Sequence, residues 1–487
     1  MSIISLSFMV FTLAAILGYF ILPMKVRPYW LLLASLFFYG CFGLKPFIFI
    51  GVSIVSTFAC AHMTSSLAAK GKKSRAKAVL FVTVLLNMGL LAVVKYLNYS
   101  LSLLGRAFDF NAPVFTLIVP LGIAFYSMQA VSYCVDVYRG KYAPEKNIFK
   151  YTLYMTFFPI IMQGPISRYD QLADQLFTPQ RFSFDRLRSG LSLVLWGLFK
   201  KMVIADRAAL LVNQVFGNYT EYEGFEIIIA ALLYTVQIYT DFSGCVDISR
   251  GIAEVFGIQL RGNFDHPYFA VSIKDFWRRW HMSLSSWFKD YIYIPLGGSR
   301  KGRLRKYINL LVVFFVSGLW HGVGIHYIAW GLLQGFFQIA GELTEKTRYK
   351  IYDLCGVDRT SFSYKLGQQF VTFVLVNISW VFFRADGLIA ALKMLKYAAF
   401  SYNPWIFTDG SFLAMGLDGK DWNVLIFSLA VLLVVSLLQE RMSIRKELEK
   451  QSFWFRYAIY TAAILAILIF GMYGPGYDAA QFIYMQF

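Results

Sequence analysis

Long apolar stretches with few charged residues constrain the fold of this chain more than any other feature. Eight of them occupy residues 3–22, 46–69, 79–104, 113–135, 226–249, 364–383, 422–438 and 457–472. Each is apolar around most of its circumference, whereas a surface helix of a soluble protein keeps one polar face. Because a bilayer span needs about 20 apolar residues, we predict an all-α polytopic membrane protein. We expect about eleven spanning or membrane-buried helices in a single domain, residues 1–487.

The net charge of +18 is carried by short loops between the apolar stretches. The strongest basic loop is KGKKSRAK, residues 70–77, and such loops usually face the cytoplasm. We therefore attribute the charge to membrane topology and expect no binding of nucleic acid. With residues 70–77 inside, alternation of the spans places both the N-terminus and the C-terminus outside. The five cysteines show neither a disulfide framework nor metal-ligand spacing, so no metal site is predicted.

The stretch from residue 263 to residue 321 departs from the apolar pattern, and we expect the chemistry there. It contains two histidines, His281 and His321, among Trp, Arg and Gly residues. Residues 272–294 combine an aromatic stripe with a basic face, which predicts one amphipathic helix in the membrane interface. The apolar run 308–319 covers only about 18 Å of a hydrocarbon core of roughly 30 Å. His321, which follows this run, is therefore expected at membrane depth.

A neutral histidine can accept a proton from a hydroxyl group, as acyl transfer from a thioester requires. His321 is the better candidate for this base, because Trp320 and Gly322 leave room for a substrate and exclude water. The alternative is that His321 is a hydrogen-bonded packing residue. For His281 the favoured alternative is an interfacial side chain with a solvated tip.

Two acidic residues, Asp241 and Asp247, lie within an apolar helical pattern. The simpler interpretation is that they cap helix ends or pair with Arg250, Arg278 or Arg279. The alternative is that they line a substrate tunnel, since ionisable groups at membrane depth usually face a cavity or a partner. The basic stretch 343–363 is expected to be a cytoplasmic loop.

A polyanionic substrate would be attracted to a basic entrance on the cytoplasmic side. Five basic residues can supply it, namely Arg278, Arg279, Arg300, Lys301 and Arg303. Membrane topology explains the same residues equally well.

Four motifs resemble the membrane-bound O-acyltransferase family, specifically its bacterial alginate O-acetylation branch. They are NFDHPYFAVSIKDFWRRWHMSLSSWFKDYIYIPLGGSR, SGLWHG, YTDFSGCVDISRGIA and WVFFRA. The resemblance implies helices around a funnel that meets a narrow tunnel, and acyl transfer from a cytoplasmic thioester to an external hydroxyl group. It places the family's near-invariant histidine on His321 and its second histidine on His281. Candidate substrate or tunnel residues are then Asp241, Asn263, Arg278, Trp280 and Trp320.

The resemblance also implies the partners. The donor substrate is expected to be acetyl-CoA, with no permanently bound cofactor. An SGNH-hydrolase-like partner outside the cytoplasm is expected to pass acetyl to a cell-surface or exported polysaccharide. The enzyme itself is expected among the lipids of a bacterial cytoplasmic (inner) membrane.

A further resemblance concerns the tail at residues 482–487, where Phe482, Tyr484 and Phe487 match an FxYxxF pattern. In related D-alanylation systems this pattern lies on a separate small peptide, whose tyrosine is thought to receive the acyl group. The hypothesis is that His321 deprotonates Tyr484 and that a tyrosine ester passes to the partner. The alternative is an aromatic anchor at the membrane interface.

Two other functions remain open at this point. One is a teichoic acid D-alanyl transferase, whose donor is a carrier-protein thioester. The other is a secondary transporter, in which buried histidines relay protons between broken helices. The sequence shows no paired half-repeats in favour of a transporter.

Overall fold

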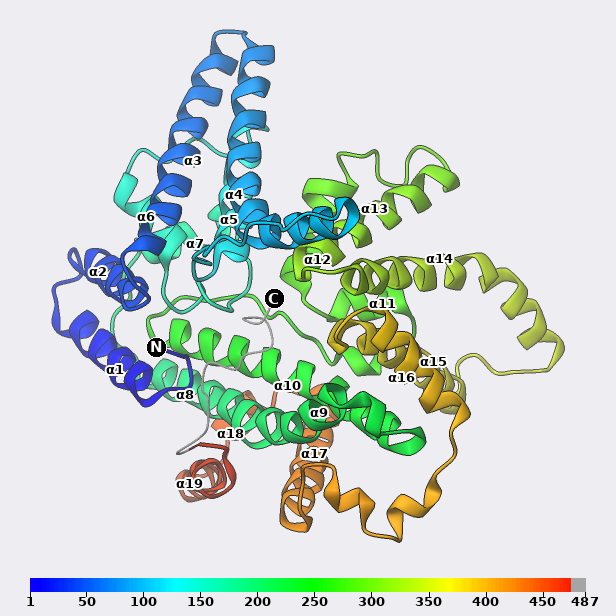
Figure 1. Ribbon diagram of the computed structural model, residues 1–487. Coiled ribbons are helices and arrows are strands. Elements are labelled where there is room, and N and C mark those ends of the chain that lie inside the picture. The colour runs from blue at the N-terminus through cyan, green and yellow to red at the C-terminus, as the bar shows by residue number, and fades with distance from the viewer. Residues whose placement is uncertain (474–487) are drawn as a thin grey trace. The chain divides into compact units, whose positions relative to one another are not determined.

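A computed structural model describes residues 1–473, and this part of the chain is helical without any strand (Figure 1). Six of its helices are long and apolar enough to cross a membrane: α3 (Lys45–Ala69), α4 (Lys73–Phe108), α10 (Gly224–Val255), α15 (Phe362–Arg384), α17 (Gly419–Gln439) and α19 (Phe453–Phe470). The predicted all-α membrane fold is confirmed. The predicted number of about eleven helices included membrane-buried helices as well as spanning ones, and this number stays approximate. The tail motif with Phe482, Tyr484 and Phe487 lies outside the described residues.

The chain packs as two compact units. Unit 1 consists of Met1–Val194 and Cys245–Arg261, and unit 2 consists of Leu195–Gly244 and the chain from Gly262 onward. The division falls within two helices, α8 (Phe184–Leu198) and α10. Packing units need not fold separately, so the single domain stays a prediction.

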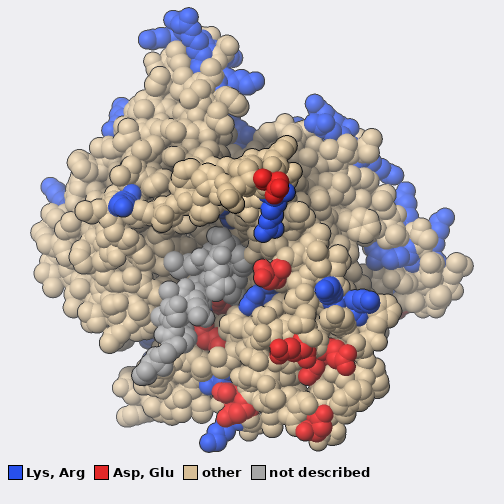
Figure 2. Space-filling view, in the orientation of Figure 1, with Lys and Arg blue, Asp and Glu red and all other residues tan. Residues whose placement is uncertain are grey.

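Unit 1 is built around a helical hairpin formed by α3 and α4 (Figure 1). Lys and Arg side chains gather at the tip of this hairpin, at residues 70–77 (Figure 2). The remaining complete helices of the unit are α1 (Leu6–Ile21), α2 (Arg27–Gly40), α5 (Ile123–Tyr138), α6 (Ile148–Thr156) and α7 (Tyr169–Leu176).

The expected helix at 113–135 is partly wrong, because α5 begins only at Ile123. Pro120 lies just before this start, and a proline disfavours helical geometry in the residue before it. Gly122 then adopts a left-handed conformation with φ of 69°. A side chain at this position would overlap the carbonyl oxygen of Ile161. The start of α5 is therefore fixed by a close approach of two backbone segments.

Unit 2 carries most of the residues singled out in the sequence. Besides α10, α15, α17 and α19, this unit contains the helices α9 (Asp206–Gly217), α11 (Ile273–Arg279), α12 (Met282–Phe288), α13 (Arg303–His321), α14 (Ile325–Leu354), α16 (Leu388–Phe400) and α18 (Ile444–Glu449). It also contains two π-helical turns, Phe199–Ala205 and Lys289–Tyr293. The antiparallel pair α13 and α14 packs closely, with a connection of three residues.

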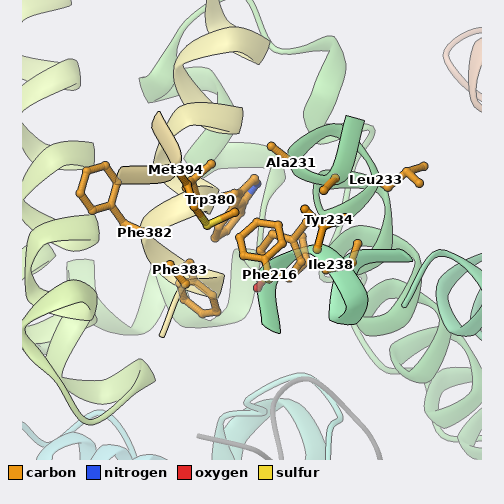
Figure 3. Close-up of a cluster of buried hydrophobic side chains, with 14 of the residues drawn as sticks. Phe216, Ala231, Leu233, Tyr234, Ile238, Trp380, Phe382, Phe383 and Met394 are labelled. Carbon is orange, nitrogen blue, oxygen red and sulfur yellow. The ribbon is translucent and has the colours of Figure 1, made fainter. Parts of the chain in front are cut away.

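An aromatic core holds unit 2 together. Trp380 and Phe383 project from α15 into a cluster that includes Phe216 and Tyr234, whereas Phe382 points in a different direction (Figure 3). Lipid is as apolar as these side chains, so close packing contributes more to such a core than removal from water.

Two predicted boundaries in unit 2 are wrong. The single helix expected at 272–294 is divided into α11 and α12, because the backbone turns at His281. The loop expected at 343–363 is helical as far as Leu354. Side-chain hydrogen bonds between residues one or two turns apart support that helix, for example from Tyr349 to Glu345. Gly356, in a left-handed conformation, follows the end of the helix.

Candidate active site

His281 occupies the break between α11 and α12. Its backbone is left-handed, with φ of 42° and ψ of 54°, a conformation that costs a residue with a side chain about 1–2 kcal/mol. The His281 carbonyl accepts the first hydrogen bond of α12 from Ser285 at 3.0 Å. The side chain is 0% exposed. The expectation of a solvated tip is therefore wrong, and strain of this kind is typical of functional positions.

Asn263 orients the His281 ring. Its Oδ1 accepts the backbone N–H of Ser283 at 2.9 Å, so its Nδ2 is the atom facing the ring, 3.1 Å from His281 Nδ1. Oδ1 of Asn263 lies farther from the same nitrogen, at 3.4 Å. We therefore assign Nδ1 as the acceptor, which in a neutral imidazole leaves the proton on Nε2. Burial lowers the pKa of His281 to about 3 and keeps the ring neutral. His281 is thereby prepared as a hydrogen-bond donor.

His321 is the last residue of α13 and is 3% exposed. Gly322 follows in an extended conformation and ends the helix. A side chain at Gly322 would overlap the ring of Tyr327, so glycine is required where α13 turns into α14. The depth of His321 in a membrane stays a prediction.

Three aromatic rings enclose the His321 imidazole. Ring centroids lie 4.8 Å away for Trp320, 4.9 Å for Trp330 and 5.2 Å for Phe383. These side chains come from α13, α14 and α15. An imidazole in such surroundings is shielded from water.

Trp320 connects the two histidines. Its ring lies 6.1 Å from that of His281 and contacts His321 directly. On the other side of His281, Phe242 of α10 packs edge-on at 4.8 Å. The structure thus brings His281, Asn263, Trp320 and His321 into one cluster, although they come from separate segments of the sequence.

Asp241 and Asp247 both form ion pairs. Asp247 pairs with Arg250 at 3.1 Å, one of the partners expected. Asp241 pairs instead with Lys201 at 2.8 Å, and Lys201 also binds Asp206 at 2.8 Å. The sequence did not indicate Lys201, because it lies on a π-helical turn that hydrophobic periodicity does not reveal. Pairing with an expected partner is confirmed for Asp247, whereas the partner of Asp241 is a lysine that was not among those expected, and its place in a substrate tunnel stays a prediction.

The remaining candidates lie in different surroundings. Trp280 is buried, with its ring stacked on Phe276 at 5.4 Å. Arg278 is exposed, as are three other basic residues proposed for a donor entrance, Arg300, Lys301 and Arg303. Arg279 pairs with Asp275 and Glu440. Among residues 1–473, no group of three His, Cys, Asp or Glu side chains is placed to hold a metal ion.

Sequence reasoning missed Trp330 and Phe383 as neighbours of His321. Phe383 lies in the WVFFRA motif, so that motif was the available signal. Trp330 follows His321 by nine residues and had none. Its position depends on the tight connection between α13 and α14.

Comparison with known proteins identifies the class of enzyme to which this cluster belongs. Residues 145–351 match the family model of the membrane-bound O-acyltransferases. The chain is also 33% identical over 393 residues to the probable alginate O-acetylase AlgI of Pseudomonas syringae pv. tomato, across 80% of this chain and 72% of the relative. The chain belongs to the membrane-bound O-acyltransferase family, and it is a multi-pass membrane enzyme that transfers acyl groups to hydroxyl groups.

Two further relatives show how the family varies. The peptidoglycan O-acetyltransferase of Helicobacter pylori is 34% identical over 415 residues, across 78% of this chain and 76% of the relative. The teichoic acid D-alanyltransferase of Bacillus subtilis is 27% identical over 257 residues, across 49% of this chain and 62% of the relative.

Proposed function

We propose that this enzyme transfers acetyl from cytoplasmic acetyl-CoA to hydroxyl groups of a polysaccharide outside the cytoplasm. The observation that carries the proposal is the buried His321, enclosed by three aromatic rings next to a second, neutral histidine. The relatives named as alginate and peptidoglycan O-acetyltransferases support acetyl as the acyl group. The exposed Arg278, Arg300, Lys301 and Arg303 are the proposed contacts for the anionic donor.

His321 acts as the general base in this proposal. It takes the proton from the attacking hydroxyl group while the oxygen forms a bond to the acyl carbon of the thioester. The C–S bond then breaks, and the leaving thiolate takes that proton back from His321. Protons therefore balance over one transfer, and no external acid is needed.

His281 has a different task. Its Nδ1 accepts from Asn263, so its Nε2–H can only donate. We assign it the role of a fixed donor that orients the substrate without exchanging protons. Trp320, in contact with both rings, keeps the two histidines at a constant separation.

Tyr484 is the proposed first acceptor of the acetyl group. Near the end of the described chain, the N–H of Met472 donates to the carbonyl of Met202 at 3.0 Å, both in unit 2. Tyr484 follows Met472 by 12 residues, and an extended segment of that length spans at most about 40 Å. A phenol ester stays activated for onward transfer. An SGNH-hydrolase-like partner would then deliver acetyl to the polysaccharide.

Localisation follows from the same proposal. The donor is cytoplasmic and the acceptor is external, so the enzyme is placed in the bacterial cytoplasmic (inner) membrane. The basic tip of the α3–α4 hairpin then faces the cytoplasm (Figure 2).

The experiment that tests the proposal compares two donors with the purified protein in detergent. Labelled acetyl-CoA and a labelled D-alanyl carrier-protein thioester are each offered, and transfer of label to protein or added glycan is measured. We expect transfer from acetyl-CoA alone. Transfer from the carrier thioester alone would place the enzyme with the teichoic acid D-alanyltransferases instead.

A further inference from the structure

Four tryptophans form a connected group in the core of unit 2. Trp330 stacks on Trp380, with planes 16° apart and centroids separated by 5.7 Å. Trp277 packs against Trp330 at 5.9 Å, and Trp280 packs against Trp380 at 5.2 Å. Within this group, Trp330 is the residue that contacts the His321 imidazole.

The indole N–H groups of the stack differ in how they are satisfied. Trp277 donates to Oε1 of Gln334 at 3.2 Å, and Gln334 in turn donates to Ser379 at 2.6 Å. Trp330 is 0% exposed, and its N–H has no acceptor among residues 1–473. Burial of an unpaired N–H is costly, and native proteins rarely leave one without a reason. Trp380 also lacks an acceptor for its N–H among the described residues, and the two tryptophans differ in that Trp330 packs against the His321 ring.

The position of Trp330 limits what that ligand can be. Its ring stands at 87° to the His321 imidazole, with centroids 4.9 Å apart. Trp330 therefore belongs to the aromatic wall around the proposed base, and an acceptor bound to its N–H lies at that wall. In an acyl transfer the base needs the attacking hydroxyl group beside it, and the acyl carbonyl oxygen needs a hydrogen-bond donor where its negative charge develops.

We infer that Trp330 is a catalytic residue whose indole N–H binds the carbonyl oxygen of the thioester. When the hydroxyl oxygen attacks the acyl carbon, the π electrons of the carbonyl move onto its oxygen, and His321 takes the hydroxyl proton. The indole donates a hydrogen bond to that negative oxygen and keeps its own proton. When the carbonyl re-forms, the C–S bond breaks and the thiolate takes the proton from His321. Fixed donors of this type stabilise the transition state more than the bound substrate.

This inference rests on the proposed acetyl transfer, and its test separates the two. Trp330→Phe keeps an aromatic ring but removes the N–H. Trp380→Phe is the matched control, because it makes the same change in the stacked ring, whose N–H also lacks an acceptor among the described residues. We expect Trp330→Phe to lower kcat about 100-fold, with little change in KM for acetyl-CoA. Trp380→Phe should change kcat by less than about threefold. Equal losses in both variants would attribute the effect to packing and overturn the inference.

A spectroscopic measurement makes the test independent of turnover. The measurement uses the His321→Ala variant, which we expect to be inactive, so that bound donor is not consumed. Acetyl-CoA labelled with 13C at the carbonyl is added to this variant, and the carbonyl stretching frequency is recorded by difference infrared spectroscopy. We expect a shift to lower frequency that is lost when Trp330→Phe is added, while acetyl-CoA still binds. If Trp330→Phe leaves the carbonyl frequency unchanged while the wild type is active on acetyl-CoA, the role of Trp330 is refuted and the proposed function stays intact. A wild type that does not use acetyl-CoA would remove the proposed function, and this inference with it.

Discussion

Nδ2 of Asn263 lies 3.1 Å from Nδ1 of His281, closer than the 3.4 Å that separate Oδ1 of Asn263 from the same nitrogen, and we assign the shorter contact as a hydrogen bond donated by the amide. The same amide accepts the N–H of Ser283 through its oxygen, so it cannot rotate without losing a bond. His281 is therefore held both in position and in one tautomer. Partners of this kind usually matter nearly as much as the residue that they orient.

Asn263→Asp tests this relationship with minimal change in shape. The carboxylate can still accept from Ser283 but can no longer donate to His281, so it draws the ring proton to Nδ1. We expect kcat to fall at least about 10-fold, with KM for the donor little changed, because the donor at Nε2 is lost. Steady-state kinetics with acetyl-CoA measure both constants. Wild-type kcat in Asn263→Asp would show that the tautomer of His281 is irrelevant.

The stability of the protein should depend on pH through His281. Burial depresses its pKa to about 3 in the folded protein, whereas the unfolded chain has the ordinary value of about 6.5. The unfolded state therefore binds more protons below that value, so this contribution is complete above about pH 6.5 and declines as the pH falls towards 3. We expect Tm to drop between about pH 7.5 and pH 5. The drop should be smaller in His281→Gln, and an equal drop in both proteins would contradict the buried neutral ring.

Phe383 should limit the length of the acyl group. Phe383→Leu removes part of the ring that encloses His321, and one methylene in an apolar pocket changes specificity about 10-fold or more. We expect kcat/KM for propionyl-CoA to rise relative to acetyl-CoA. Phe382→Leu is the control, since Phe382 points in a different direction from Phe383 (Figure 3). The prediction fails if Phe383→Leu, like the Phe382→Leu control, keeps the wild-type preference for acetyl-CoA over propionyl-CoA.

Lys201 should be important for stability. Lys201→Met leaves Asp206 and Asp241 without their shared cation in the interior, and breaking a buried ion pair from one side costs about 3–5 kcal/mol. We expect a lower Tm in detergent, partly restored by adding Asp241→Asn, which removes one of the two carboxylates that share Lys201. A lack of restoration would indicate that Lys201 stabilises unit 2 through packing alone.

The sequence predicted the fold well, because apolar stretches of bilayer length define the spanning helices. It also singled out His281 and His321, which the structure brings together at Trp320, while their catalytic roles stay predictions. The turn at His281 could not be predicted, because a left-handed residue without glycine looks helical in a periodic pattern. The partners Trp330, Phe383 and Lys201 also escaped prediction. They reach the site through tertiary packing or a π-helical turn, and neither leaves a periodic pattern.

Labelled acetyl transfer from acetyl-CoA to the purified protein tests the central claim most directly. We predict a covalent label on the wild type and on His326→Gln, a nearby histidine outside the cluster, and no label on His321→Ala. Tyr484→Phe should also lose the label, because the proposed ester forms on its hydroxyl group. Label retained in His321→Ala, with the protein folded, would contradict the assignment of His321 as the base.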